Sequence, residues 1–385
     1  MATTDRSQRR AVVVGAGALG GWTALHLTRL GWEVTLVDAW GPGNGRASSG
    51  GETRVIRRGY GHRSHYVPLV TRALELWGEL EESAKTPLLD RRGVLWMASQ
   101  PGEFERESMD AFRAEGVRFE ELSRGELEGR YPSMSFGDIP WAMYEPDAGA
   151  LFARRGCEVV WDAVREAGGR VLVSTARPAL DSSGACRGVQ LADGSTHLAD
   201  VTVFAAGPWM PELFPEALGS RLEVTRQDVF SFGPPPGAEE HLRLPVWAEH
   251  ATELFGDGSF WYGIPDGLSR GFKLGEDTSG GPWDPTHGER VVDPERLERA
   301  RAYLSHRFPA LADAPLIDAR VCQYTMRRDS ELLVDRHPGL PGLWLLGGGS
   351  GHGYKLGPAI GEVAARAIDL DQALPEPLRG LQLLD

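Results

Sequence analysis

The segment 11–38 constrains the fold of this chain more than any other part of the sequence. It begins with Ala11–Val14, a short apolar run rich in β-branched residues, as expected for a buried strand of a parallel sheet. A stretch with helical spacing of its apolar residues follows and ends at Gly31, and Glu33–Val37 predicts a second strand. A strand, a helix and a second strand in this order predict a βαβ unit of a parallel sheet.

Three glycines and one acid in this unit predict what it binds. Gly15 permits a tight turn, Gly17 lets a pyrophosphate approach the backbone, and Gly20 allows the helix to pack closely on the strand. The helix N-terminus attracts negative charge, and Asp38 at the end of the second strand can accept hydrogen bonds from a ribose 2′-hydroxyl. An acid there would repel a 2′-phosphate, so the unit predicts a site for FAD or NAD and leaves the choice between these two open.

Strand and helix patterns of the same kind recur later in the chain, with blocks of antiparallel character between them. The predicted elements are a helix at 153–167, a strand at 170–174, a strand at 201–205, a strand at 343–346 and a helix at 358–370. We therefore expect an α/β fold in which a Rossmann-like dinucleotide-binding domain carries an inserted α+β domain with a mixed or antiparallel sheet. The expected boundaries are 1–84, 146–222 and 320–385 for the first domain, and 85–145 and 223–319 for the second, which would bind the substrate.

Charge and cysteine content exclude several classes of protein. Lys and Arg number 41 and Asp and Glu number 54, and the resulting net charge of −13 disfavours binding to nucleic acid or to anionic membranes. Three cysteines, Cys157, Cys186 and Cys322, cannot form a disulfide framework and match no zinc spacing. With no apolar run of about 18 residues and no signal-peptide pattern, we expect a cytoplasmic protein without a membrane anchor and without a metal site.

Several segments, taken in order, resemble one family. They are VVVGAGALGG (12–21), GGETRVIRRGYG (50–61), YVPL (66–69), EPDAGALF (145–152), AAGPW (205–209), FKLGED (272–277), VCQYT (321–325) and GGSGHGYKLGPAIGE (348–362). The chain resembles the FAD-dependent amine oxidases of the monomeric sarcosine oxidase type, within the D-amino acid oxidase superfamily. This resemblance spans nearly the whole chain and implies that the first domain binds FAD rather than NAD.

The resemblance implies roles for a set of cofactor-binding residues. Cys322, which would otherwise be taken for a small apolar residue, matches the cysteine that forms a thioether to the flavin 8α-methyl group. Ser48 would contact the pyrophosphate. The backbone N–H groups at Gly351 and Gly353 would approach the pyrimidine end of the flavin, and His352 between them would support that region without acting as a base.

The resemblance also implies how substrate and O₂ would be handled. Arg57 and Lys355 match the two cations that hold a substrate carboxylate, and Lys355 would also lie beside the flavin. Lys273 would face the flavin and promote its reaction with O₂, with Arg54 close to both. Only three lysines occur in the chain, Lys85, Lys273 and Lys355, and two of them fall in these motifs.

Three further residues are expected to line the substrate pocket. Tyr262 and Tyr324 match positions where the family places aromatic residues. Asp277 is a departure, since the sarcosine-type sequence has a histidine there, and Ser49-Gly50 replaces a pair of histidines of that type. These departures put sarcosine itself in doubt and leave room for a larger, cationic or hydroxylated substrate.

The expected activity is oxidation of a C–N bond in an amino acid or an N-alkyl or cyclic amino acid. An imine would form and be hydrolysed, and O₂ would be reduced to H₂O₂. The alternatives are a biosynthetic flavoenzyme acting on a cyclic or modified amine, a dehydrogenase with another electron acceptor, an inactive flavin-binding subunit and an NAD-dependent dehydrogenase. The expected partners are a small amine or amino acid and O₂, and a monomer is the default for the family.

Overall fold

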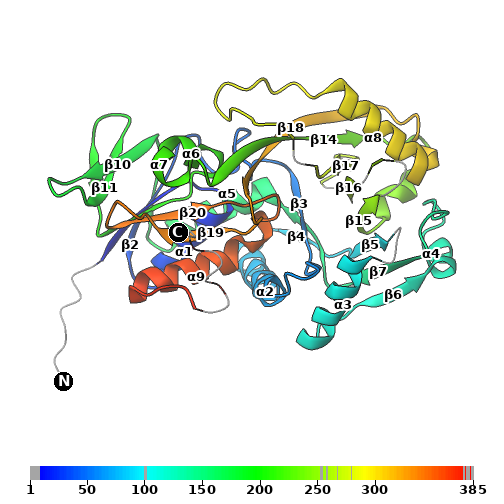
Figure 1. Ribbon diagram of the computed structural model, residues 1–385, viewed down its shortest axis with the longest axis horizontal. Helices are drawn as coiled ribbons and strands as arrows, with labels where there is room; N and C mark the ends of the chain where they lie inside the picture. The colour runs from blue at the N-terminus through cyan, green and yellow to red at the C-terminus, as the bar shows by residue number, and fades with distance from the viewer. Residues whose placement is uncertain are drawn as a thin grey trace.

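A computed structural model describes residues 9–382, apart from 99–101, 252–254, 257–258, 267, 279, 376–377 and 379–381. Two large sheets dominate these residues, one in each half of the view in Figure 1. No helix in the described part of the chain is long and apolar enough to cross a lipid bilayer.

The first sheet has six strands in the order β19-β20-β13-β1-β2-β9. Its strands are β1 (Arg10–Val14), β2 (Glu33–Asp38), β9 (Arg170–Val173), β13 (Val201–Phe204), β19 (Leu333–Arg336) and β20 (Leu343–Gly347). All neighbours are parallel except β19, which pairs antiparallel with β20 at one edge. The predicted βαβ unit and the later parallel strands are therefore confirmed.

Alternating side chains of β1 bury the two faces of this sheet against different layers. Ala11 and Val13 belong to the core beneath the helices, whereas Val12 and Val14 belong to a second core beneath the small sheet β10-β11-β12. The helical layer consists of α1 (Ala18–Arg29), α2 (Tyr66–Ala84), α5 (Ala153–Glu166) and α9 (Gly357–Leu370), with α2 and α9 seen side by side in Figure 1. Burial on both faces explains why the strand sequence is continuously apolar.

The second sheet has eight strands in the order β18-β14-β17-β16-β15-β5-β7-β6. They are β5 (Val94–Ala98), β6 (Glu120–Ser123), β7 (Trp141–Glu145), β14 (Leu222–Phe232), β15 (Val246–Ala251), β16 (Ser259–Pro265), β17 (Phe272–Glu276) and β18 (Leu316–Arg327). Neighbours are antiparallel except β5 and β15, which are parallel. The expected mixed sheet is confirmed, and with it the predicted fold class.

One face of this sheet packs on α8 (Pro294–Arg307), and the other face is left for a cavity. Phe230 and Phe232 of β14 share a core with Tyr303 and Leu304 of α8. The residues between them on β14 point to the opposite face, because successive side chains of a strand alternate. This face carries the candidate active site.

The remaining elements connect the two sheets or cover them. They are the sheet β3 (Thr53–Ile56), β8 (Gly149–Phe152) and β4 (Leu89–Asp90), the sheet β10 (Ala176–Leu180), β11 (Cys186–Leu191) and β12 (Thr196–Leu198), and the helices α3 (Glu103–Glu115), α4 (Arg124–Arg130), α6 (Met210–Leu213), α7 (Pro215–Leu218), η1 (Gly207–Trp209), η2 (Glu239–Arg243), η3 (Pro309–Leu311) and η4 (Tyr354–Leu356). Strand β18 starts before residue 320 and pairs with β14 along its length, so the expected boundary at 320 falls inside a strand of the second sheet. The division into two domains stays a prediction.

Candidate active site

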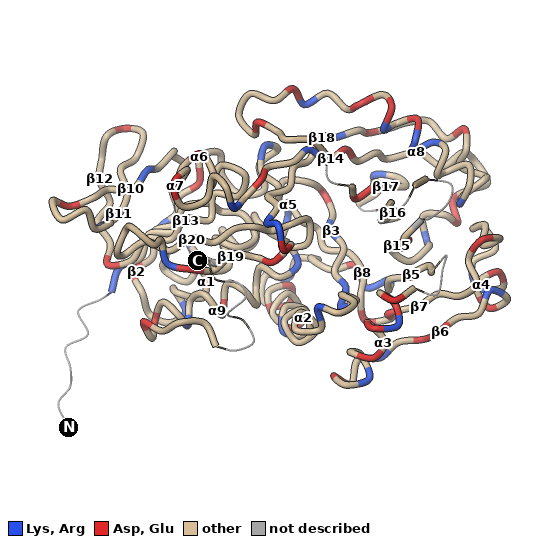
Figure 2. Tube along the Cα trace, in the orientation of Figure 1, with Lys and Arg blue, Asp and Glu red and all other residues tan. Residues whose placement is uncertain are grey.

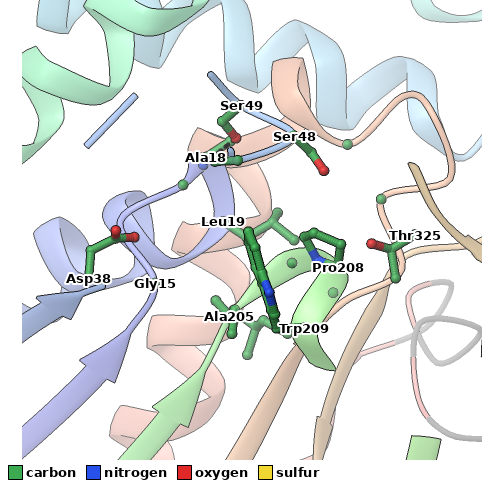
Figure 3. A pocket seen from close by; sticks show the side chains of 18 of the residues that line it. Gly15, Ala18, Leu19, Asp38, Ser48, Ser49, Ala205, Pro208, Trp209 and Thr325 are labelled. Atoms are coloured by element: carbon green, nitrogen blue, oxygen red, sulfur yellow. Dashed lines mark hydrogen bonds between the residues drawn. The ribbon is translucent and has the colours of Figure 1, made fainter. Parts of the chain in front are cut away.

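A first cavity lies at the carboxyl ends of the parallel strands, next to the N-terminus of α1 (Figure 3). Gly15 has φ +108°, and a Cβ there would come within 2.3 Å of the Ala205 carbonyl oxygen. At Gly20 a Cβ would come within 2.0 Å of the Gly15 carbonyl oxygen. Both positions exclude any larger residue, which is the close packing that the motif predicts.

Polar groups around this cavity suit a dinucleotide. Asp38 accepts hydrogen bonds from the backbone N–H groups of Ala16 (2.8 Å) and Trp40 (2.9 Å), and its two oxygens can accept more. Ser49 Oγ accepts from the Ala18 N–H at 3.2 Å. The Ser48 hydroxyl lines the cavity and is buried without a hydrogen-bond partner among the described residues. An anion at the start of α1 would supply that partner.

A second cavity continues from the first. Arg54, Tyr324, Gly351 and Tyr354 line both. Gly351 has φ +77°, and a Cβ there would lie 2.9 Å from the Tyr324 ring. The two cavities therefore form one elongated space, as a cofactor with an adenine end and a flavin end requires.

The floor of the second cavity is one face of the eight-stranded sheet. Every second residue of β18 and β14 contributes to it, and β16 and β17 add to the same surface. These residues are Asp318, Arg320, Cys322 and Tyr324 of β18, Gln227, Val229 and Ser231 of β14, Lys273 of β17, and Phe260 and Tyr262 of β16. The period of two follows from strand geometry, so the register of the sheet decides which side chains meet.

Cys322 lies where the two cavities meet, beside Arg54. The Sγ atom is 3.7 Å from the Arg54 guanidinium, which also donates to the carbonyl oxygens of Ser48 and Thr53. Cys157 and Cys186 are buried and lie outside both cavities.

Arg57 and Lys355 lie in the second cavity around the same aromatic ring. The Arg57 guanidinium is 4.2 Å and the Lys355 ammonium 5.0 Å from the centre of the Tyr60 ring. Arg57 donates to the Gly59 carbonyl and Lys355 donates to the His352 carbonyl at 3.1 Å. Among the described residues, neither cation forms a salt bridge. Burial lowers the pKa of both side chains, and the nearby charge of Arg57 lowers the pKa of Lys355 further. A carboxylate between them would offset these effects.

His352 is held by two hydrogen bonds that fix its state. Its Nε2 lies 2.9 Å from the Ser330 carbonyl oxygen and its Nδ1 lies 3.0 Å from the Tyr60 hydroxyl. The carbonyl can only accept, so Nε2 carries the proton and Nδ1 accepts from Tyr60. Burial and the nearby Lys355 hold the pKa of His352 well below its usual value. The neutral ring ties the glycine loop to Tyr60, and the expectation that it is not a base stays a prediction.

The Lys273 side chain extends from the floor of the second cavity toward β3. Its ammonium donates to the carbonyl oxygen of Thr53 at 3.1 Å and lies 3.3 Å from the Thr53 hydroxyl. Burial, with a contribution from the Arg54 charge, lowers the pKa of Lys273 to about 7. The lysine is therefore close to a change of charge at neutral pH.

Asp277 follows β17 and faces the cations across the cavity. It interacts with the Tyr324 hydroxyl, which in turn interacts with Tyr262. Burial raises the pKa of Asp277, while Arg57 and Lys355 act in the opposite direction. All of the residues expected in the substrate pocket thus come together in one cavity. Their roles stay predictions.

Cations outnumber acids in this cavity although the chain as a whole is acidic. Along the outer segments the two kinds of charge are interspersed (Figure 2), and the net charge is −13. Arg54, Arg57, Arg63, Arg270, Lys273, Arg320 and Lys355 line the cavity, against Glu52, Asp277 and Asp318. The local field therefore favours an anionic ligand.

Sequence reasoning missed part of the lining. Trp96, Gln227, Phe260 and Arg320 were not expected in the site. The alternation of Gln227, Val229 and Ser231 with two phenylalanines was visible in the sequence and indicates a two-faced strand. It could not show which residues of β18 would lie beside these side chains, because that pairing joins segments about ninety residues apart.

Comparison with known proteins places the chain in a family. The family described as FAD dependent oxidoreductase (DAO) matches residues 10–367. Monomeric sarcosine oxidase from Bacillus sp. (strain B-0618) is 30% identical over 361 residues, which cover 92% of this chain and 90% of that protein. N-methyl-L-tryptophan oxidase from Yersinia pestis (strain Pestoides F) is 28% identical, with 92% and 93% covered.

Solved structures share the fold. L-proline dehydrogenase from P. horikoshii superposes with a TM-score of 0.82 at 20% sequence identity, covering 97% of this chain and 96% of that one. Since the match to the family extends over nearly the whole chain and includes both cavities, this protein belongs to the family of FAD-dependent oxidoreductases and resembles its amine oxidases.

Proposed function

We propose that this protein is an FAD-dependent oxidase that acts on a C–N bond of an amino acid or of an N-alkyl or cyclic amino acid. The observation that carries the proposal is a pair of cations, the half-buried Arg57 and the buried Lys355, in a cavity continuous with the dinucleotide cavity. The names of the similar proteins, monomeric sarcosine oxidase and N-methyl-L-tryptophan oxidase, support substrates that carry both a carboxylate and a secondary amine.

Residues of this chain would bind and orient such a substrate. Arg57 offers a planar fork and Lys355 a compact charge, and a carboxylate between them would fix the position of the α-carbon and the amine. Bound FAD would supply the hydride acceptor and would pass the two electrons on to O₂. His352 is held neutral and fully hydrogen-bonded, so it takes no proton from the amine. Orientation in a closed cavity then accounts for most of the rate.

The proposed reaction consumes O₂ and water as co-reactants. The amine loses a hydride and a proton to give an imine, and water hydrolyses the imine to a carbonyl compound and an amine or ammonia. When the imine is cyclic, the carbonyl and the amine stay in one ring-opened molecule. O₂ takes up two electrons and two protons to give H₂O₂. The Lys273 ammonium, held by Thr53, would stabilise the negative charge that develops on O₂.

The role of Lys273 predicts a pH dependence. The pKa of Lys273 is lowered to about 7, so the side chain is charged below that pH and neutral above it. Flavin reoxidation by O₂ is therefore expected to slow as the pH rises through about 7. Stopped-flow reoxidation between pH 6 and about 9 measures this. Lys273→Arg stays charged throughout and is expected to flatten the profile, whereas an unchanged profile in that variant would contradict the assignment.

Covalent attachment of FAD through Cys322 is the second part of the proposal. Acid precipitation of the purified protein is expected to leave the yellow colour in the pellet, because a thioether survives denaturation. Cys322→Ser is expected to release the colour into the supernatant. Cys186→Ala, at a buried cysteine that lines neither cavity, serves as the control and should keep a yellow pellet. A yellow pellet from the Cys322 variant would show that the link lies elsewhere.

A substrate panel with a peroxide readout tests the proposed activity. It should contain N-methyl, N-alkyl and cyclic amino acids, each beside the corresponding amine without a carboxylate. Peroxide formed in proportion to the amine consumed, from the carboxylates alone, is the expected result. Amine oxidation without peroxide would instead indicate a dehydrogenase with a different electron acceptor.

A further inference from the structure

Glu145 is a buried acid that lies behind the candidate active site without lining either cavity. It is the last residue of β7 and the first residue of the segment 145–152. Its side chain is 0% exposed. A carboxylate removed from water is costly unless hydrogen bonds and an opposite charge compensate for the lost hydration. The groups that compensate it therefore indicate its role.

Both carboxylate oxygens of Glu145 accept hydrogen bonds from Arg58. The Arg58 backbone N–H lies 2.9 Å from Oε1 and 3.0 Å from Oε2, and the Arg58 guanidinium lies 3.2 Å from Oε1. The same guanidinium donates to the Thr71 hydroxyl of α2 at 3.1 Å. Glu145 thus joins the eight-stranded sheet to the segment that follows β3 and, through Arg58, to the helical layer.

These hydrogen bonds hold the peptide bond between Arg57 and Arg58. The Arg58 N–H is part of that planar group, so fixing it also fixes the backbone of Arg57. The Arg57 guanidinium lines the second cavity, 4.2 Å from the centre of the Tyr60 ring and 5.2 Å from that of the Trp96 ring. The Glu145 carboxylate therefore sets the place from which Arg57 extends into the cavity.

Glu145 also acts on the charge of the cavity. Burial raises its pKa, while the charges of Arg58 and Arg57 and the hydrogen bonds from Arg58 act in the opposite direction. All of its printed partners are N–H donors and one is a guanidinium, so they stabilise the ionised form. Burial lowers the pKa of Arg57 and of Lys355, and the negative charge of Glu145 counteracts this in both.

Building on the proposed function, we infer that Glu145 is a positioning residue for the site that receives the substrate carboxylate. Its hydrogen bonds hold Arg57 in place, and its charge favours the charged forms of Arg57 and Lys355 before the substrate binds. Unlike Asp277, Glu145 lies outside the cavity, so it compensates the two cations without taking up space at the ligand. The substrate then meets a site that is already assembled, which lowers the cost of binding.

Glu145→Gln removes the charge and keeps most of the hydrogen bonds. An amide oxygen in the place of Oε1 can still accept from the Arg58 N–H and guanidinium. The probe is (methylthio)acetate, a carboxylate with sulfur in place of the amine, and its binding to the purified holoenzyme is followed by the flavin's visible spectrum. Between about pH 6 and about 10, the affinity of the unmodified protein is expected to fall as Lys355 loses its proton. In Glu145→Gln this fall should begin about one pH unit lower, because Lys355 has lost a negative neighbour.

The other groups near Lys355 are the same in both proteins. Besides Glu145, the titratable or charged side chains that act on Lys355 or contact it are Arg57, Arg63, Asp277, Tyr60 and His352. Lys273 titrates near pH 7 in the same cavity. Because none of them is altered, a displacement between the two curves comes from position 145.

Two further variants separate the charge from the hydrogen bonds and from folding. Glu145→Asp keeps the charge on a shorter side chain, and it is expected to weaken the probe about 10-fold at every pH without displacing the curve. Glu249 of β15 is the matched control, since it is 2% exposed and accepts from the Arg307 guanidinium of α8 at 2.7 and 3.0 Å. Glu249→Gln also removes the charge of a buried acid from this sheet, and it should leave the pH dependence in place.

The outcomes distinguish the inference from the proposed function. If the probe does not change the flavin spectrum of the unmodified protein, the proposed carboxylate site is wrong. If the probe binds and the Glu145→Gln curve coincides with that of the unmodified protein, or if Glu249→Gln displaces the curve as far, the proposed function stands and the inference is overturned. Should Glu145→Gln not fold, Glu145→Asp decides, and an unchanged affinity in that variant contradicts the inference.

Discussion

Replacing Lys273 with Met is expected to slow the reoxidation of reduced flavin by O₂ by about 100-fold or more, while its reduction by substrate stays nearly unchanged. The ammonium is held over the cavity by the carbonyl and hydroxyl oxygens of Thr53. Among the described residues it forms no salt bridge, so its charge is available to the negative charge that develops on O₂. Met has nearly the same length and suits a buried site, so the cavity should keep its shape.

Stopped-flow measurements of the two half-reactions give this result directly. Lys85→Met is the matched control, because Lys85 is an exposed lysine at the end of α2. It should change neither rate. Equal losses in both half-reactions of Lys273→Met would contradict the role in oxygen reduction and would indicate a general disturbance of the site.

Replacing Arg57 or Lys355 with Met is expected to lower kcat/KM for a carboxylate substrate by about 100-fold in each case. A charge-assisted hydrogen bond is worth about 1.5–3 kcal/mol, and 1.4 kcal/mol corresponds to a factor of ten. If the carboxylate no longer binds between the two cations, the cation that remains also loses its ligand. Because both cations lie around the Tyr60 ring, an apolar side chain of similar length can occupy either place.

The corresponding primary amide of the same substrate is the control for this prediction. Its turnover is already low without the carboxylate, and neither variant should lower it much further. Steady-state kinetics on the acid and the amide measure the difference. If both substrates lose activity to the same extent, the two residues maintain the structure of the cavity and do not bind the carboxylate.

The dinucleotide part of the fold was predictable because its signals are local. A Cβ atom at Gly15 or at Gly20 would collide with a nearby backbone carbonyl oxygen, so only glycine fits at these positions. Asp38 lies in the same βαβ unit. Turn, helix and strand preferences over some thirty residues therefore specify that unit. The parallel sheet of the structure confirms it.

The cavity floor was not predictable in the same way. Its side chains come from strands that are distant in sequence, and pairing between β14 and β18 decides that Gln227 lies beside Cys322. Period-two alternation shows that such a strand has two faces, yet it does not show what each face meets. Arg57, Lys273 and Lys355 were named through the resemblance to a family, and the structure brings these three into one cavity.

Anaerobic mixing of the purified protein with an N-methyl amino acid tests the central claim most directly. The flavin's visible absorption is expected to bleach within the turnover time and to return, with one H₂O₂ per flavin, when air is admitted. The amine without its carboxylate should not bleach it. A protein that carries no flavin, or a flavin that no carboxylate-bearing amine reduces, would contradict the account.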